Sequence, residues 1–184
     1  MNKLNPYVNE ALLSHNRQIT KFPVKDLQDL KRIISEKYKE NPKHIDLNSY
    51  DISNLTDLSY AFSHCSETEE ISIEFWDVSQ VLSMEAMFFE CESLKKIDIC
   101  HWDVKKLNTT NSMFFGCKSL VDLDLSKWSC YNLHDMDYMF FKCSKLENLK
   151  FIETYILDLK KISTQNMFKG CFTLSRNKKL PIWY

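Results

Sequence analysis

Two cysteines have a histidine beside them in the sequence, in the pairs His64–Cys65 and Cys100–His101. A neighbouring histidine can accept the thiol proton and so produce a thiolate, the nucleophile of thiol-dependent catalysis. Cys65, however, belongs to a series of equally spaced cysteines, and adjacent residues on a strand point to opposite faces. We therefore expect structural thiols at these positions, and a thiol-dependent enzyme is the second alternative to the function derived below.

No other catalytic or cofactor motif is present. The chain lacks a GxSxG nucleophile motif, a glycine-rich phosphate loop and an HExxH motif. Its histidines are scattered without the spacing of zinc ligands, and no CxxC pair occurs: His15, His44, His64, His101 and His134. We expect no catalytic residue, no cofactor and no metal ion.

Acidic residues are concentrated in one part of the chain. Residues 44–103 contain 13 acids against Lys95 and Lys96 alone, although the whole chain has a formal net charge of −1. A surface of one sign attracts oppositely charged partners. It disfavours nucleic acid, which needs Lys and Arg to replace phosphate counterions. The sequence predicts a basic protein partner, while turn formation and solubility are the competing interpretation for individual acids.

A repeat of 26 residues positions all of these side chains. Phrases of the type Met-Phe-Phe-x-Cys end at cysteines spaced by 26, 26, 26 and 28 residues: Cys65, Cys91, Cys117, Cys143 and Cys171. An aromatic series has the same spacing, Tyr50, Trp76, Trp102 and Trp128. A fixed period of this length indicates a repeat architecture. The five cysteines are expected to be reduced and buried, as small hydrophobic residues.

Each repeat contains the spacing LxxLxL, for example Leu120, Leu123 and Leu125. The alternating pair predicts a short strand, and the apolar spacing in Ser83–Phe89 predicts a helical turn with Met84, Met87 and Phe88 facing inward. The expected fold class is an α/β leucine-rich-repeat solenoid of about five coils, over residues 44–65, 66–91, 92–117, 118–143 and 144–171. Because the chain has only 2 glycines, left-handed turns should be rare, with corners formed by Asp, Asn and Ser side chains.

A helix is predicted before the repeats, from Val24 to Glu40, because Leu27, Leu30, Ile33 and Ile34 lie on one face. Terminal elements of repeat proteins cover the exposed core of the first and last repeats. The predicted organisation is an N-terminal segment with a capping helix over residues 1–43, the solenoid over 44–171, and a C-terminal cap over 172–184.

The repeat, written LxxLxLxxWDVxxL…MFxxC, resembles the BspA-type leucine-rich repeat family over about residues 24–184. The clearest matches are Trp76-Asp77-Val78-Ser79 with Met87-Phe88-Phe89-Glu90-Cys91, and Trp102-Asp103-Val104 with Met113-Phe114-Phe115-Gly116-Cys117. Tyr50 and Ala61 depart from the pattern, as does the fifth repeat. The resemblance implies a protein-binding scaffold, often at bacterial surfaces, with no catalytic residues to transfer.

Positions that flank the predicted strand pairs form the candidate binding surface. The partner-binding residues predicted on it are Asp46, Glu70, Ser72, Glu74, Asp98, Asp122 and Asp124. Five parallel strands about 4.8 Å apart would make a face roughly 20–25 Å across. With its edges, that face suits an interface of about 800 Å² per partner.

These features predict a non-catalytic protein-binding repeat protein. Its most specific form is an intracellular immunity-type inhibitor that neutralises a cognate basic toxin, such as a nuclease, through an acidic solenoid face. No segment approaches the roughly 20 apolar residues that cross a bilayer, and Met1–Thr20 lacks a continuous apolar signal segment. A cytoplasmic location without a membrane partner is therefore expected, and a bacterial surface or host-interaction adhesion module is the first alternative.

Overall fold

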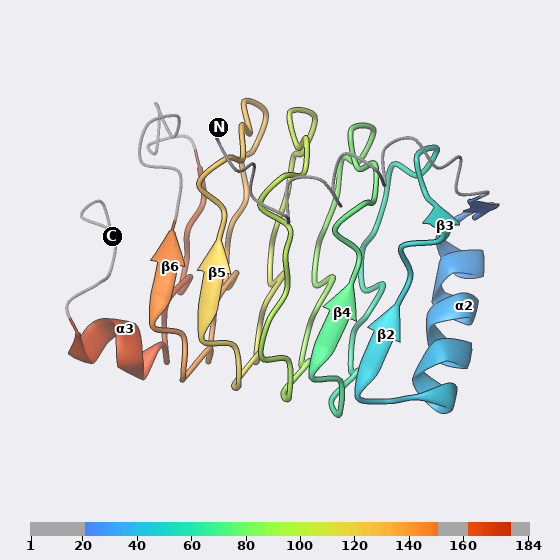
Figure 1. Cartoon of the computed structure of the whole chain (residues 1–184). Coiled ribbons are helices and arrows are strands. Elements are labelled where there is room, and N and C mark those ends of the chain that lie inside the picture. Colours follow the sequence, from blue (N-terminus) through green and yellow to red (C-terminus); the bar gives the residue numbers. More distant parts are fainter. Residues whose placement is uncertain (1–20, 151–161, 178–184) are drawn as a thin grey trace, which may run out of the picture.

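A computed structural model of the protein describes residues 21–150 and 162–177, to which the structural statements below apply. Successive repeats lie side by side, and each presents its strand segment on the same side of the molecule (Figure 1). Helix α2 (Leu27–Glu40) lies at one end of this row and helix α3 (Phe172–Arg176) at the other. Residues 178–184 of the predicted C-terminal cap lie outside the described part of the chain.

The N-terminal helix is confirmed, although it begins at Leu27 and not at Val24. Asp26 is its N-cap, and its side chain accepts a hydrogen bond from the Asp29 amide at 2.8 Å. Leu30, Ile33 and Ile34 are buried against the core of the first repeat. The helix therefore covers apolar side chains of the core at this end of the row of repeats.

The strands are short and pair in parallel. β2 (His44–Asp46) pairs with β4 (Glu70–Ser72), and β5 (Asp122–Asp124) pairs with β6 (Asn148–Lys150). β1 (Phe22–Pro23) pairs with β3 (Tyr50–Asp51). Between β4 and β5, the segment 96–98 makes only the isolated bridge from Glu70 to Lys96. The described residues therefore contain separate two-stranded sheets instead of one continuous five-stranded sheet.

The predicted α/β leucine-rich-repeat solenoid of five coils is wrong. Besides the interrupted sheet, the predicted helical turn at Ser83–Phe89 is absent, and hydrogen-bonded turns take its place. The amide of Met87 donates to Met84 O at 3.3 Å, and that of Phe89 donates to Ala86 O at 3.0 Å. Alternate amides bond instead to the next repeat, as Ala86 N does to Asn111 O at 2.8 Å. Amides used in this way are unavailable for the i to i−4 bonds of a helix.

The inward direction predicted for Met84, Met87 and Phe88 is confirmed, because all three are fully buried. Their spacing resembles that of a helix because two consecutive turns return the chain to the core at similar intervals. The first phenylalanines of the repeated phrases form a buried column with ring centroids 5.2–5.8 Å apart: Phe62, Phe88, Phe114, Phe140 and Phe168.

The expectation that left-handed turns are rare is also wrong. Two positions in each repeat have positive φ, between 50° and 86°, and only two of the ten residues are glycines: Tyr60, His64, Ala86, Glu90, Ser112, Gly116, Tyr138, Lys142, Asn166 and Gly170. A left-handed residue with a side chain costs about 1–2 kcal/mol. Bonds between repeats offset that cost, since Tyr60 N donates to Glu85 O at 2.9 Å and His64 N to Phe89 O at 2.8 Å.

The five repeated cysteines are free thiols and buried, as predicted. Their column also has a role that the sequence analysis missed. Each of four thiols donates a hydrogen bond to a carbonyl of the preceding repeat: Cys91 to Phe62 O at 3.1 Å, Cys117 to Phe88 O at 3.2 Å, Cys143 to Phe114 O at 3.0 Å and Cys171 to Phe140 O at 2.9 Å. Each of these carbonyl groups also accepts a hydrogen bond from the amide of the cysteine three residues later, so the thiol is a second donor that links the carbonyl to the next repeat.

The predicted role of polar side chains at the corners is confirmed. Aspartates accept a hydrogen bond from the amide two residues later, as Asp46 does from Asn48 at 3.0 Å and Asp77 does from Ser79 at 3.0 Å. Such bonds fix a turn locally.

The buried tryptophans hold neighbouring repeats together unequally. The indole N–H of Trp76 donates to Leu47 O at 3.0 Å, and that of Trp128 donates to Ile99 O at 2.8 Å. The equivalent atom of Trp102 is buried and has no partner within the described residues. Nor does Ile73 N bond to Asp98 O there, although the equivalent bond from Leu47 N to Ser72 O is formed at 3.0 Å. The strand side is therefore loosely bonded between the second and third repeats.

Because the three indole groups differ in hydrogen bonding, the same substitution should lower the free energy of unfolding by different amounts at the three positions. Trp76→Phe and Trp128→Phe should each destabilise the protein by about 1–2 kcal/mol more than Trp102→Phe, because only the first two substitutions remove a buried indole hydrogen bond. Urea unfolding of the three variants under one set of conditions measures the difference. Equal losses of stability in all three would contradict this account.

The left-handed positions yield a second prediction. In Ala86→Gly, relief of strain at φ 50° should offset the lost methyl group and the added flexibility of the unfolded chain, so the free energy of unfolding should stay nearly unchanged. Ala61 is also buried but has no positive φ, so Ala61→Gly should cost about 1 kcal/mol. Urea unfolding tests the pair, and an equal cost at both sites would refute the assignment of strain to Ala86.

Candidate functional site

All seven predicted partner-binding residues lie on the side of the molecule that carries the strands. Asp46 ends β2, Glu70 and Ser72 belong to β4, and Asp122 and Asp124 belong to β5. Glu74 follows β4, and Asp98 lies in the segment 96–98 between the two sheets. None of the seven is buried. We call this surface the strand face, with these residues: His44, Asp46, Asn48, Glu70, Ser72, Glu74, Lys96, Asp98, Cys100, Asp122, Asp124, Ser126, Asn148 and Lys150.

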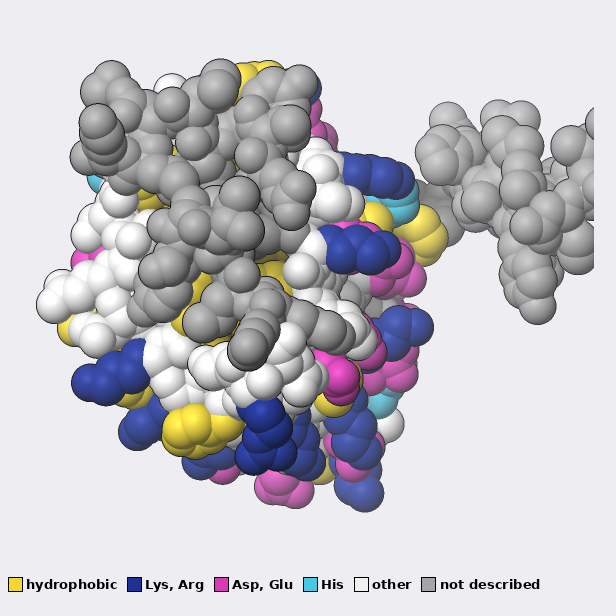
Figure 2. Space-filling model, turned by 90° about the vertical axis from the view of Figure 1, so that its left-hand side faces the viewer, with side chains coloured by type: hydrophobic (Ala, Val, Ile, Leu, Met, Phe, Trp, Pro, Cys, Tyr) yellow, Lys and Arg dark blue, Asp and Glu magenta, His cyan; other side chains and the backbone are white. Residues whose placement is uncertain are grey.

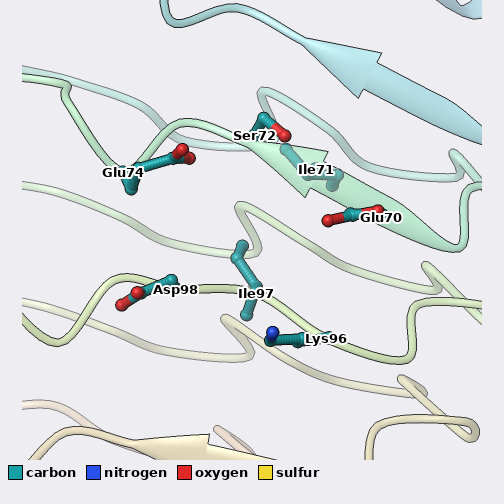
Figure 3. Close-up of a pocket in the computed structure, with 7 residues that line it drawn as sticks. All are labelled: Glu70, Ile71, Ser72, Glu74, Lys96, Ile97 and Asp98. Carbon is teal, nitrogen blue, oxygen red and sulfur yellow. The ribbon is translucent and has the colours of Figure 1, made fainter. Parts of the chain in front are cut away.

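A shallow hollow of about 190 Å³ lies at the centre of the strand face, where strand pairing is interrupted (Figure 3). Glu74 and Asp98 stand at one end of it, Glu70 and Lys96 at the other, and Ile71 and Ile97 between them. Cavities that enclose small molecules usually measure about 300–1,000 Å³. The hollow is therefore better suited to one protruding side chain of a larger partner.

The charge around the hollow is negative, because three carboxylates face one ammonium group. Glu70 lies 3.3 Å from His44 Nδ1. Neither Glu74 nor Asp98 forms an ion pair within the described residues. The Asp98 carboxylate accepts a long hydrogen bond, 3.4 Å, from the Cys100 amide. These carboxylates remain available to an external cation.

Asp122 and Asp124 are engaged within the protein. Asp122 accepts a hydrogen bond of 2.6 Å from the Asn148 side chain. The Ser126 hydroxyl and amide, followed by the Lys150 ammonium at 3.0 Å, lower the pKa of Asp124 to about 2. The turn interpretation holds for Asp46, Asp98 and Asp124, which accept hydrogen bonds from the amides two residues later. Their carboxylates also add negative charge to the strand face, and attraction of a basic partner by this charge stays a prediction.

The remaining acids of residues 44–103 do not extend this surface. Glu69 pairs with Lys95 in the next repeat, and Glu92 pairs with Lys118 at 2.7 Å. Asp77 and Asp103 fix other corners of the repeats. Lysine and carboxylate side chains are interspersed over the described part of the view in Figure 2. The strongly acidic segment of the sequence is therefore not one acidic patch, because each repeat distributes its residues around the molecule.

The two Cys–His pairs do not form a thiolate site in this geometry. His64 Nδ1 lies 3.1 Å from Glu90, and His101 Nδ1 lies 3.3 Å from the Lys127 ammonium. Burial raises the pKa of Cys65 to about 11. Desolvation, followed by the Asp98 carboxylate, also raises the pKa of Cys100. Both shifts favour the protonated thiol, which is a poor nucleophile.

The described residues, 21–150 and 162–177, hold neither a cluster of metal ligands nor a membrane-spanning helix. They contain no group of three or more His, Cys, Asp or Glu side chains that could hold a metal ion. No helix in them has the length and apolar character to span a membrane.

The second phenylalanine of each phrase forms an outer column that the sequence analysis did not consider. The rings of Phe89, Phe115 and Phe141 are half-buried and stacked, with centroids 4.7 and 4.8 Å apart. His64 contacts the ring at one end edge-on, and the Lys142 ammonium lies 5.4 Å from the ring centroid at the other end. Because the faces of these rings are covered, the column offers no open platform for stacking a sugar or a base.

The repeated parallel units and the charged face without a deep cavity define a repeat protein with a candidate protein-binding surface. The chain belongs to the family described as "Mycoplasma protein of unknown function, DUF285", whose model matches residues 6–68, 28–155 and 56–183. These overlapping matches, shifted along the chain, are what a repetitive sequence produces. The expected membership of the BspA-type leucine-rich repeat family is therefore wrong. Comparisons with curated proteins and with solved structures gave no match.

The raised pKa of Cys65 predicts how its contribution to stability depends on pH. Below pH 9 the thiol is neutral in both states and its contribution is fully present. Between pH 9 and about 11 it ionises only in the unfolded chain, so the contribution is lost as pH rises. The stability difference between the wild type and Cys65→Ala should therefore shrink by about 2 kcal/mol over this range.

Urea unfolding of both proteins at pH 8, 9, 10 and 11 measures this difference. Ser66→Ala, an exposed neighbouring substitution without a titrating group, should differ from the wild type by the same amount at every pH. A Cys65→Ala difference that stays constant with pH would rule out the proposed ionisation.

Proposed function

We propose that this protein is a non-catalytic binding protein that captures a basic protein partner through the strand face. The proposal depends mainly on the charge of that face. It carries six carboxylates, at Asp46, Glu70, Glu74, Asp98, Asp122 and Asp124, against the ammonium groups of Lys96 and Lys150. Complementary charge steers association and suppresses unsuitable partners.

The shape of the strand face supports a macromolecular partner over a small molecule. Its carboxylates are spread over four successive repeats, and the hollow at its centre is shallow. A long basic side chain could reach Glu74 and Asp98, which have no cationic partner within the described residues. Arginine suits this site because its planar group donates several hydrogen bonds to carboxylates.

The specific form of this proposal is an immunity-type inhibitor of a basic toxin. A nuclease, for example, binds polyanionic substrate through basic side chains, and a carboxylate-bearing surface could occupy the same residues. In this form, the activity of the toxin must fall when the two proteins bind. If the partner is bound but its activity does not fall, the binding function is retained and the proposal that the protein is an inhibitor is refuted.

Glu74→Lys tests the strand face. The substitution changes the local charge by two units beside the hollow, so affinity for a basic partner recovered from cells at low salt should fall about tenfold. Glu67→Lys is the matched control: Glu67 is exposed and lies outside the strand face, so its variant should retain wild-type affinity. Binding would be measured by surface plasmon resonance with the purified partner. Equal affinity of the Glu74→Lys variant and the wild type would refute the proposal.

A further inference from the structure

Two exposed aromatic rings lie at one corner of the molecule, beside the strand face. Phe22 is 60% exposed and Phe75 is 57% exposed. The Lys21 ammonium donates to Phe75 O at 3.1 Å, and the Asn48 side chain accepts from Phe75 N at 3.2 Å. These bonds bring the two aromatic residues, 53 positions apart in the sequence, to adjoining parts of the surface.

Phe22 is held in place although it is exposed. Its amide donates to Ser49 O at 2.8 Å, and the amide of Val24 donates to Asp51 O at 2.9 Å. Its ring lies against Tyr50, with centroids 5.8 Å apart. An aromatic side chain ordered in this way loses little conformational entropy when a partner covers it. We call Phe22, Tyr50 and Phe75 the aromatic corner.

Phe75 differs from the residues at the same position in the other repeats. Those residues are Ser49, His101 and Lys127, all polar. The 26-residue pattern therefore does not require an apolar side chain there, and the core does not bury it. A large exposed apolar residue at an otherwise polar position calls for an explanation outside the fold.

A groove adjoins Phe22 and Tyr50, between the end of α2 and strands β2 and β3. Its volume is about 430 Å³, and its lining also includes His44 and Asp46. This volume lies within the usual range of binding pockets. Because His44 and Asp46 also belong to the strand face, the groove and the carboxylate surface are continuous.

We propose that the aromatic corner and its groove bind a large apolar side chain of the same basic partner, one flanked by arginine or lysine. This inference rests on the proposed function and names the second chemical feature of the partner. Aromatic anchors surrounded by polar groups account for much of the energy of protein interfaces. Asp46 and Glu74, which adjoin the corner, complement the flanking basic residues in charge.

Two labelled peptide amides of matched charge test the inference, Arg-Trp-Arg-Arg and Arg-Ala-Arg-Arg. Fluorescence anisotropy at low salt gives their affinities for the full chain. The wild type should bind the tryptophan peptide about tenfold more tightly, because only that peptide buries an indole ring. Phe22→Ser should abolish the preference while both peptides still bind. Glu74→Lys should weaken both peptides by a similar factor.

Phe172→Ser is the matched control, since Phe172 is 66% exposed and lies in α3 at the opposite end of the molecule. This variant should keep the tenfold preference. Equal binding of both peptides to the wild type, or loss of the preference in Phe172→Ser, would refute the role of the aromatic corner in binding. Neither result would contradict the proposed role of the charged strand face. Binding of neither peptide would overturn the inference and the proposed function together.

Discussion

Hydrogen bonds between equivalent backbone positions of neighbouring repeats govern this structure. In the turn segments, alternate amides such as Phe62 N and Phe88 N donate to Met87 O and Met113 O, 25 residues further along the chain. A segment bonded in this way cannot be helical, and it adopts turns with two left-handed residues per repeat. The same arrangement brings the phenylalanine and cysteine columns into contact, because equal positions must then lie above one another. The alignment of neighbouring repeats therefore both pairs the backbone hydrogen-bonding groups and brings the buried side chains into contact.

The periodic sequence was sufficient to predict which residues face inward. The phenylalanine, methionine and cysteine columns are buried, and the capping helix lies where its apolar spacing indicated. The period did not reveal the backbone conformation between Ser83 and Phe89, since two consecutive turns bury the same residues as a helical turn would. The small number of glycines wrongly suggested that left-handed turns are rare. Hydrogen bonds between repeats stabilise Tyr60 and Ala86 in the left-handed conformation, which in isolated turns is adopted mainly by glycine.

The candidate site was predictable in its location but not in its extent. Counting outward positions placed Glu70, Glu74 and Asp98 on one face, and they do line one hollow. Composition alone could not show that Glu69 and Glu92 pair with lysines of the next repeat, because those pairs join residues 26 positions apart. Nor could it show that Phe75 would be exposed, since tryptophan at the next position is buried. Which acids are free to bind depends on contacts between repeats, and these exist only in the folded chain.

The spacing of the hydrogen bonds also bears on how such a protein can change in length. Alternate amides on the turn side find their acceptors in the next repeat, whichever repeat that is, and the others find theirs within their own repeat, so a deletion or duplication of 26 residues preserves the bonding scheme. Insertions of other lengths would shift the thiol and phenylalanine columns out of contact. The contact area available to a partner can therefore grow or shrink in whole units, while the chemistry at each end of the row stays the same.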